Sequence, residues 1–131
     1  MIIDSSALVA ILAGEADAAR YAQAIETDPT PRIGTPALLE ASIVLIRWYC
    51  DDALAALDAF TREAGAEVVA FDLPQLRAAQ AAYLRFGKGR HPAGLDFGDC
   101  MSYALAQASG EPLLYKGNDF SHTDIEPALT E

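Results

Sequence analysis

The sequence predicts an α/β domain in which helices cover both faces of a short parallel sheet. Short apolar, β-branched segments alternate with longer helical segments along the chain, which is the order that produces a parallel sheet. The length of 131 residues suits one domain, and a hydrophobic content of 52% is enough for a sizeable core. We therefore expect residues 1–131 to form a single three-layer α/β/α domain around a sheet of four to five strands.

The first half of the chain is expected to contain, in order, a strand over residues 1–4, helices over 6–13 and 16–26, a strand over 32–34 and a helix over 36–49. Ser5 is a good N-cap for the first helix, and Gly14 ends it. The TDPTP segment breaks the second helix. Thr35 is the expected cap of the third helix, with Pro36 in a first-turn position where an N–H has no intrahelical partner.

The second half is expected to contain, in order, a helix over residues 51–64, a strand over 67–71, a helix over 73–86, a loop over 87–95, a helix over 97–109 and a strand over 112–115. The strand over 67–71 is β-branched and aromatic. Asp96 is the expected N-cap of the last helix, which stops at Gly110. A last short strand near Ile125 would bring the sheet to five strands.

The chain carries a formal charge of −10, from 19 acidic residues against 9 lysines and arginines. This balance argues against binding of nucleic acid, because phosphate contacts need cations. The objection weakens if several acids are metal ligands, since a bound cation inverts the local field. The positions of the carboxylates therefore decide how the charge is interpreted.

Cys50 and Cys100 lie in apolar segments that are predicted to be helical, so we expect buried, reduced thiols rather than a disulfide. The first thirteen residues superficially resemble a signal peptide, but they lack a basic start and carry Asp4 within the apolar stretch. No run approaches the roughly 18 apolar residues that a membrane span needs. We expect a soluble, cytoplasmic protein that makes no membrane contact.

Four carboxylates from distant parts of the chain fall at predicted strand ends or helix beginnings: Asp4, Glu40, Asp99 and Asp119. The carboxyl ends of parallel strands form the edge where open sheets place their sites. Each acid also has a purely structural interpretation, since Asp4 could cap a helix, Glu40 could face solvent and Asp119 could be a turn residue. Asp96 and Asp99 have the spacing of a capping box. The coincidence of all four acids nevertheless favours one shared site.

Such a cluster of carboxylates needs a counter-charge. Two ionised carboxylates about 5 Å apart repel by roughly 3 kcal/mol at an effective dielectric of about 20. Hard oxygen ligands select Mg²⁺ or Mn²⁺, and neither histidine has the spacing of a zinc ligand. The acids therefore predict a magnesium or manganese site.

Four segments of the chain follow a known family pattern in order and spacing: MIIDSSALVAIL, TPALLEASIV, GKGRHPAGLDFGDCMSYALA and PLLYKGNDFSHTDI. They closely resemble VapC toxins, the PIN-domain ribonucleases of bacterial toxin–antitoxin pairs, and the resemblance covers nearly the whole chain. It implies a PIN-like fold and the following metal-binding and catalytic residues: Asp4, Glu40, Asp99 and Asp119. Two positions depart from the family, which commonly has Asn at the position of Asp96 and often has an acid at that of Gly117. Whether Asp96 adds charge or only caps a helix is left open.

By resemblance, the protein is the toxin of a type II toxin–antitoxin system, an Mg²⁺- or Mn²⁺-dependent endoribonuclease that hydrolyses RNA phosphodiester bonds. Asp4 and Asp99 are the expected direct ligands. Glu40 and Asp119 would bind through water or help to deprotonate it. Ser6 could orient Asp4 through its hydroxyl, although a plain helix-start serine is an equal alternative.

Two protein partners are expected. A VapB-like antitoxin would neutralise the toxin, as in proteins that this chain resembles, by placing a basic side chain among the acids. The helix that contains Ile43 and Trp48 has more apolar surface than one sheet face can bury, and similar family members pair through such helices. We therefore expect a homodimer.

Positive charge gathers in the loop over residues 85–91 and near the last motif. The expected contacts to the RNA backbone are Lys88, Arg90, His91 and Lys116. The structural alternative is a solvated loop. Tyr115 and Phe120 could stack on bases, but packing in the core or rim is the expectation.

Three other functional classes compete with a ribonuclease. A non-catalytic PIN-fold module that binds RNA or protein would be favoured by loss of a metal acid, and none of the four is lost. A phosphoacceptor domain needs an acceptor at a later strand end, where Asp72 instead opens an apparent helix. A phosphatase of the haloacid type needs a DxD motif, where this chain has Asp4-Ser5-Ser6.

Overall fold

The structure, a computed structural model, describes residues 1–130 and contains a parallel sheet with the strand order β3-β2-β1-β4. Within these residues the strands are β1 (Ile2–Ile3), β2 (Arg32–Gly34), β3 (Glu67–Val69) and β4 (Leu113–Leu114). Every pairing is parallel, as predicted. Within residues 1–130, the segment near Ile125 forms no strand. It contributes one isolated β-bridge, between Leu113 and Pro127. The sheet therefore has the smaller of the two predicted strand numbers.

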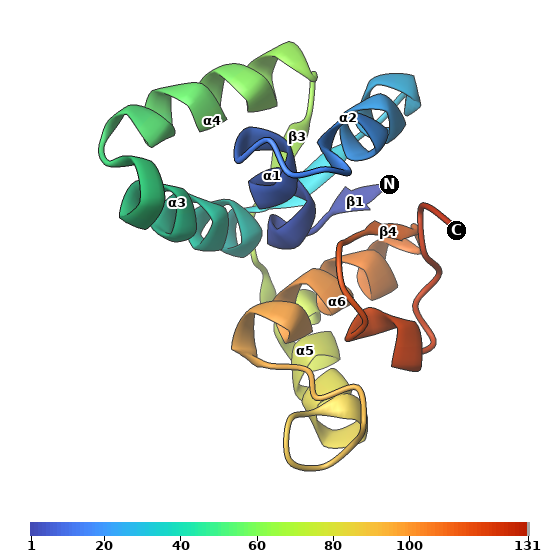
Figure 1. The fold of residues 1–131 in the computed structure, drawn as a ribbon. Coiled ribbons are helices and arrows are strands. Elements are labelled where there is room, and N and C mark those ends of the chain that lie inside the picture. Colours follow the sequence, from blue (N-terminus) through green and yellow to red (C-terminus); the bar gives the residue numbers. More distant parts are fainter. Residues whose placement is uncertain (131) are drawn as a thin grey trace.

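Helices cover both faces of the sheet (Figure 1). Their bounds are α1 (Ser5–Leu12), α2 (Ala18–Thr27), α3 (Thr35–Tyr49), α4 (Asp52–Glu63), α5 (Leu73–Phe86), α6 (Phe97–Ser109) and the short 3₁₀ helix η1 (Phe120–His122). Side chains alternate along each strand, so Ile2 packs with α5 and α6, whereas Ile3 packs with α1 to α4. This arrangement confirms the three-layer α/β/α prediction. None of the helices in residues 1–130 has the length and apolar character that crossing a membrane requires.

Two predicted helix caps are wrong by one residue. Asp4, not Ser5, caps α1, because its backbone is extended and its carboxylate accepts the Ser6 N–H at 3.0 Å. Gly34, not Thr35, precedes α3, in which Thr35 is already the first helical residue. In both places a strand leads directly into a helix, so the last extended residue becomes the cap. One acid of the predicted site therefore lies at the junction between β1 and α1.

The two cysteines lie in different environments. Cys100 is buried on α6, as predicted, and burial raises the pKa of its thiol to about 11. Cys50 is exposed, so the prediction of burial is wrong there. It follows the last residue of α3 with a φ of 63°, which a non-glycine residue rarely adopts, because the chain turns at this point toward α4. Both thiols are free.

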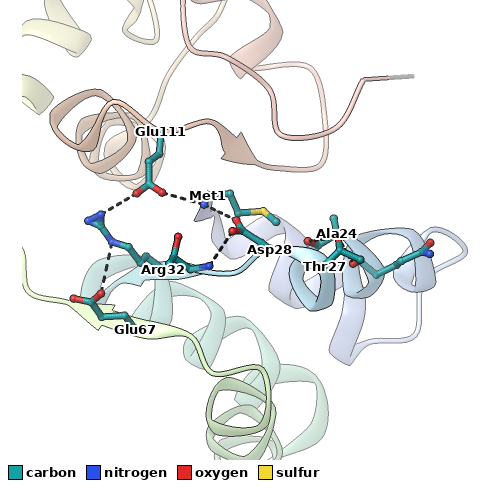
Figure 2. Close-up of polar contacts among 9 residues, drawn as sticks. Met1, Ala24, Thr27, Asp28, Arg32, Glu67 and Glu111 are labelled. Atoms are coloured by element: carbon teal, nitrogen blue, oxygen red, sulfur yellow. Dashed lines mark hydrogen bonds and ion pairs between the residues drawn. The ribbon is translucent and has the colours of Figure 1, made fainter.

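An ion-pair cluster joins the amino ends of the strands (Figure 2). The α-amino group of Met1 binds Asp28 at 2.5 Å and Glu111 at 3.2 Å. Arg32 binds Glu111 at 2.8 Å and lies 3.9 Å from Glu67. Burial raises the pKa of Asp28, but the hydrogen bonds it accepts outweigh this effect and the pKa is lowered. The cations Met1 and Arg32 are therefore paired with carboxylates at the edge of the sheet opposite the predicted site.

Candidate metal centre and active site

Asp4 follows β1 directly and is almost completely buried, with 3% of its surface exposed. Its Oδ2 accepts hydrogen bonds from the backbone N–H and the hydroxyl of Ser6, at 3.0 and 2.6 Å. Its Oδ1 accepts the hydroxyl of Ser102 on α6, at 2.5 Å. A buried carboxylate is costly unless hydrogen bonds compensate for lost hydration. These donors hold Asp4 in one orientation at the carboxyl edge of the sheet.

Glu40 projects from α3 toward the beginning of α6. The Ser5 hydroxyl donates to its Oε1 at 2.5 Å. Gly98 makes room for this carboxylate, since a β-carbon at residue 98 would lie 2.7 Å from Oε1 and 2.8 Å from Cδ. Burial raises the pKa of Glu40, the Ser5 hydrogen bond opposes this, and the charges of Asp4 and Asp96 raise it further. Glu40 is therefore a half-buried acid of this site and not a solvated helix residue.

Asp96 and Asp99 form the predicted capping box at the start of α6. Asp96 Oδ1 accepts the Asp99 N–H at 2.9 Å, and Asp99 Oδ2 accepts the Asp96 N–H at 3.1 Å. The pKa of Asp99 is raised to about 8, first by burial and then by the charges of Asp96 and Asp4, against the effect of its backbone hydrogen bond. Asp96 thus caps the helix and also adds charge to the site.

These acids fit a hard divalent cation. They offer only oxygen donors, and their mutual repulsion contributes to the raised pKa of Glu40 and Asp99. Among residues 1–130, no three His, Cys, Asp or Glu side chains converge closely enough to form a ready-made metal cluster. Each carboxylate is instead held by its own partners, namely serine hydroxyls or the capping box. Asp4, Glu40 and Asp99 are the residues that could hold such a cation, with Asp96 beside them.

Asp119, the fourth predicted acid, stands apart. It is exposed, immediately precedes η1, and is not among the charges that raise the pKa of Glu40 or Asp99. Its loop nevertheless follows β4, the neighbour of β1, and contacts the site where the Lys116 N–H donates to Ser6 Oγ at 2.9 Å. Asp119 therefore lies on the same edge of the sheet without joining the other three acids.

The predicted RNA contacts occupy two different environments. Lys88 and Arg90 are exposed in the loop between α5 and α6. The ring of His91 packs edge-on against Phe86, and its Nδ1 accepts the Ala93 N–H at 3.1 Å. Lys88 and Arg90 are thus the better placed of the predicted basic residues to meet a phosphate.

Lys116, by contrast, is already paired with carboxylates. Its ammonium binds Glu15 and Asp17, and hydrogen bonds to both raise its pKa. Phe120 is buried and packs against Tyr115 at a centroid distance of 5.1 Å, which confirms the packing role expected of these rings. Phe120 is therefore a core residue, and Lys116 is less available for a phosphate than its sequence position suggests.

An apolar groove of about 800 Å³ lies beside the acids and was not predicted from the sequence. Its lining includes Leu39 and Ile43 of α3, Phe97 and Met101 of α6, and Glu40 at the acidic end. Phe97 is 83% exposed and Leu39 is 62% exposed, which is unusual for large apolar side chains. The groove arises from packing between α3 and α6, which no local sequence pattern specifies.

The class of protein follows from this geometry, which combines a four-stranded parallel sheet within residues 1–130, helices on both faces and acids at the carboxyl edge. The family model of the PIN domain matches residues 1–126. The chain belongs to the PIN domain family.

Within this family, the chain groups with the VapC ribonucleases. It is 47% identical over 125 residues to Ribonuclease VapC30 of Mycobacterium tuberculosis, covering 95% of each chain. The crystal structure of Mycobacterium tuberculosis VapC20, described as a Sarcin-Ricin loop cleaving toxin, matches with a TM-score of 0.74 and 19% identity over 96% of this chain and 98% of that one. A toxin–antitoxin complex from Klebsiella pneumoniae matches with a TM-score of 0.70 and 14% identity, over 94% of this chain and 92% of that one. The two structures show the shared fold.

Local contacts in the structure also argue against two of the competing functional classes. Asp72, considered as a phosphoacceptor, is the N-cap of α5, where its Oδ1 accepts the Gln75 N–H at 3.0 Å. The two residues after Asp4 are serines whose hydroxyls hold Glu40 and Asp4, instead of the second acid of a DxD motif. The orienting role considered for Ser6 is therefore present in the structure.

Proposed function

We propose that the protein is the toxin of a type II toxin–antitoxin system, a Mg²⁺- or Mn²⁺-dependent endoribonuclease that acts in the cytoplasm. The observation that carries this proposal is the group of buried or half-buried carboxylates, Asp4, Glu40 and Asp99, at one edge of the sheet. The names of its relatives, which are VapC ribonucleases, support RNA as the substrate class.

A bound divalent cation would neutralise charge on the attacking and leaving oxygens during hydrolysis of the phosphodiester. Asp4, which follows β1, and Asp99, in the first turn of α6, would hold this cation. Glu40 has a raised pKa, and its Oε1 is engaged by Ser5. Its other oxygen, Oε2, can therefore accept a proton from the attacking water and release it later. We assign Asp119 a supporting role from its loop, through water.

The protein must also bind a polyanion despite its charge of −10. We assign the RNA-backbone contacts to Lys88 and Arg90, with His91 beside them. Lys116 contributes less than the sequence suggests, because Glu15 and Asp17 already neutralise its ammonium. The ion pairs of Lys116 connect the loop after β4 to the segment between α1 and α2.

The decisive experiment measures RNA cleavage by the purified protein with Mn²⁺, with Mg²⁺ and with a chelator. We expect cleavage that chelation abolishes and added metal restores. The matched variant is Asp99→Asn, which keeps an oxygen for the capping box and should lose most of the activity. Cleavage that persists in excess chelator, or at full rate in Asp99→Asn, would refute the metal-dependent mechanism.

We also propose that the protein pairs with a second copy and with a VapB-like antitoxin. Ile43, Trp48 and Tyr49 of α3 are 49%, 58% and 51% exposed, which leaves apolar surface on this helix for a partner. The antitoxin is supported by the fold match to a toxin–antitoxin complex. Sedimentation at micromolar concentration tests the dimer: the wild type should have the mass of two chains, and Trp48→Glu should have the mass of one. A wild-type mass of one chain would refute the pairing.

A further inference from the structure

Ser102 is a buried polar residue in the middle of α6. It lies on α6 one turn after Asp99 and is 5% exposed. The next three residues of the helix, Tyr103, Ala104 and Leu105, all belong to the core. Burying a hydroxyl in such surroundings is unfavourable unless it is hydrogen-bonded. Within residues 1–130, the hydrogen bond that its Oγ makes goes to Asp4 Oδ1, at 2.5 Å.

The other hydrogen bonds of Asp4 show what this contact controls. A carboxylate has about four acceptor positions, two on each oxygen. Ser6 occupies both positions on Oδ2 through its N–H and its hydroxyl. Ser102 occupies one position on Oδ1. The acceptor position that remains is therefore on the same oxygen that Ser102 holds.

We propose that Ser102 is a positioning residue that fixes Asp4 Oδ1 for binding of the divalent cation. The inference rests on the proposed metal-dependent activity and extends it to a residue outside the acidic set. Ser102 reaches Asp4 from α6, whereas Ser6 reaches it from α1, so the two hydroxyls hold the carboxylate from opposite sides of β1. The same helix carries Asp99, so Ser102 also fixes the distance between two of the cation's ligands.

A purely structural role for Ser102 has different consequences. Partners that orient metal ligands typically contribute about 10- to 100-fold to metal affinity or activity when they are removed. A hydroxyl that only fills the core would change the stability of the metal-free protein and leave its response to metal unchanged. The two roles are therefore separated by measuring melting temperature as a function of Mn²⁺ concentration.

The experiment compares wild type with Ser102→Ala, Ser102→Thr and Ser42→Ala. Ser102→Ala removes one oxygen and introduces no steric conflict, and Ser102→Thr keeps the hydroxyl. Ser42→Ala is the matched control, because within residues 1–130 the Ser42 hydroxyl bonds the Leu38 carbonyl on α3, at 2.7 Å, and no acid of the site. Each protein is melted across a Mn²⁺ titration, and kcat and KM for RNA cleavage are measured at saturating Mn²⁺ and at a lower concentration.

We expect Ser102→Ala to need about 10- to 100-fold more Mn²⁺ for half of the wild-type stabilisation. Its kcat at the lower Mn²⁺ concentration should fall, with KM for RNA unchanged. Ser102→Thr should stay close to wild type, and Ser42→Ala should match wild type in its Mn²⁺ response.

Three results would overturn the inference. In the first, wild type responds to Mn²⁺ and Ser102→Ala responds at the same concentration, which leaves the metal site intact but removes Ser102 from it. In the second, Ser102→Thr melts like wild type without metal but needs as much Mn²⁺ as Ser102→Ala, so the hydroxyl is not the determinant. In the third, wild type itself shows no Mn²⁺-dependent stabilisation, and the proposed metal dependence fails together with the inference.

Discussion

At the start of α6, Asp96 accepts the Asp99 N–H at 2.9 Å while its charge raises the pKa of both Glu40 and Asp99. Capping needs only a side-chain oxygen, which Asn supplies about as well as Asp. Binding of a cation needs the negative charge itself. The two aspartates of the capping box can therefore be distinguished by the same conservative substitution.

We expect Asp96→Asn to keep cleavage within a few-fold of wild type and to leave stability nearly unchanged. Asp96→Ala should cost about 1 kcal/mol of stability, because the Asp99 N–H loses its partner. Asp99→Asn should lose most of the cleavage and of the Mn²⁺ response while remaining folded. The three variants are compared by RNA cleavage and by melting with and without Mn²⁺. An inactive Asp96→Asn beside an active Asp99→Asn would mean that the ligand and the cap are reversed.

The raised pKa of Asp99 predicts how the metal-free protein depends on pH. Its pKa is 3.8 in an ordinary environment and about 8 in the folded protein. Between these values the unfolded chain has released the proton that the folded protein retains, so rising pH favours unfolding. We expect the melting temperature of the metal-free protein to fall between about pH 5 and about pH 8. Asp99→Asn should flatten this slope, and a wild-type melting temperature that rises over the same range would contradict the assignment.

The acids that lie together could be predicted from the sequence, and so could two of the groups that hold them, the Ser6 hydroxyl and the capping box. The contact from Ser102 to Asp4 could not. Asp4, Glu40 and Asp99 stand at positions where strands end or helices begin, and such positions can be recognised from local patterns. Ser102 lies on the buried face of α6, where a small residue is unremarkable in a sequence. Its role depends on how α6 packs across β1, and that packing is a property of the whole fold.

At the scale of elements, α3 approaches the first turn of α6 where Glu40 faces Gly98. The absence of a side chain at Gly98 allows the approach, since a β-carbon there would lie 2.7 Å from Glu40 Oε1. The helices themselves could be predicted from periodicity and breakers. Their starts were wrong by one residue at Ser5 and Thr35, because the strands run directly into α1 and α3 without an intervening loop. Those same direct junctions place Asp4 close to Glu40.

We expect Gly98→Ala to displace the Glu40 carboxylate and to lower cleavage by at least about tenfold, a shift of 1.36 kcal/mol in the barrier. Alanine is otherwise the better helix former, by up to about 1 kcal/mol. Gly98→Ala should therefore stabilise the protein in a Glu40→Ala background, in which the conflict is gone, but not in the wild-type background. The measurement is the melting temperature of wild type, Gly98→Ala, Glu40→Ala and the double variant. Equal stabilisation in both backgrounds would show that the two residues are not in conflict.

Over the whole molecule, two cationic groups that form ion pairs lie at the edge of the sheet opposite the acids of the site. Met1 and Arg32 neutralise Asp28 and Glu111 at the amino edge of the sheet, and Figure 2 shows these contacts. Within residues 1–130, no salt bridge joins a cation to Asp4, Glu40, Asp96 or Asp99 at the carboxyl edge. The carboxyl edge therefore attracts cations of any kind, whether a metal ion or a basic side chain of another protein.

This competition predicts how the proposed antitoxin inhibits the enzyme. The groove beside Glu40 presents the exposed side chains of Leu39 and Phe97. A complementary antitoxin segment is therefore apolar, with a basic residue where it meets Glu40 at the acidic end of the groove. A guanidinium suits that end, because its planar fork matches carboxylate geometry. We expect substitution of one Arg or Lys in the antitoxin tail by Gln to weaken inhibition strongly. High Mn²⁺ should weaken inhibition by the unmodified antitoxin, because metal and basic side chain compete for the same carboxylates.

The measurement is the inhibition constant of the antitoxin at low and at saturating Mn²⁺, for the unmodified tail and for each Gln variant. Phe97→Ala in the toxin serves as the matched control, because it removes apolar contact in the groove without changing the charge of the site. It should weaken inhibition equally at both Mn²⁺ concentrations, whereas the critical Gln variant should lose the dependence on Mn²⁺. Inhibition that is unaffected by replacing every basic residue of the tail would mean that the antitoxin blocks RNA by covering the groove, with no side chain among the acids.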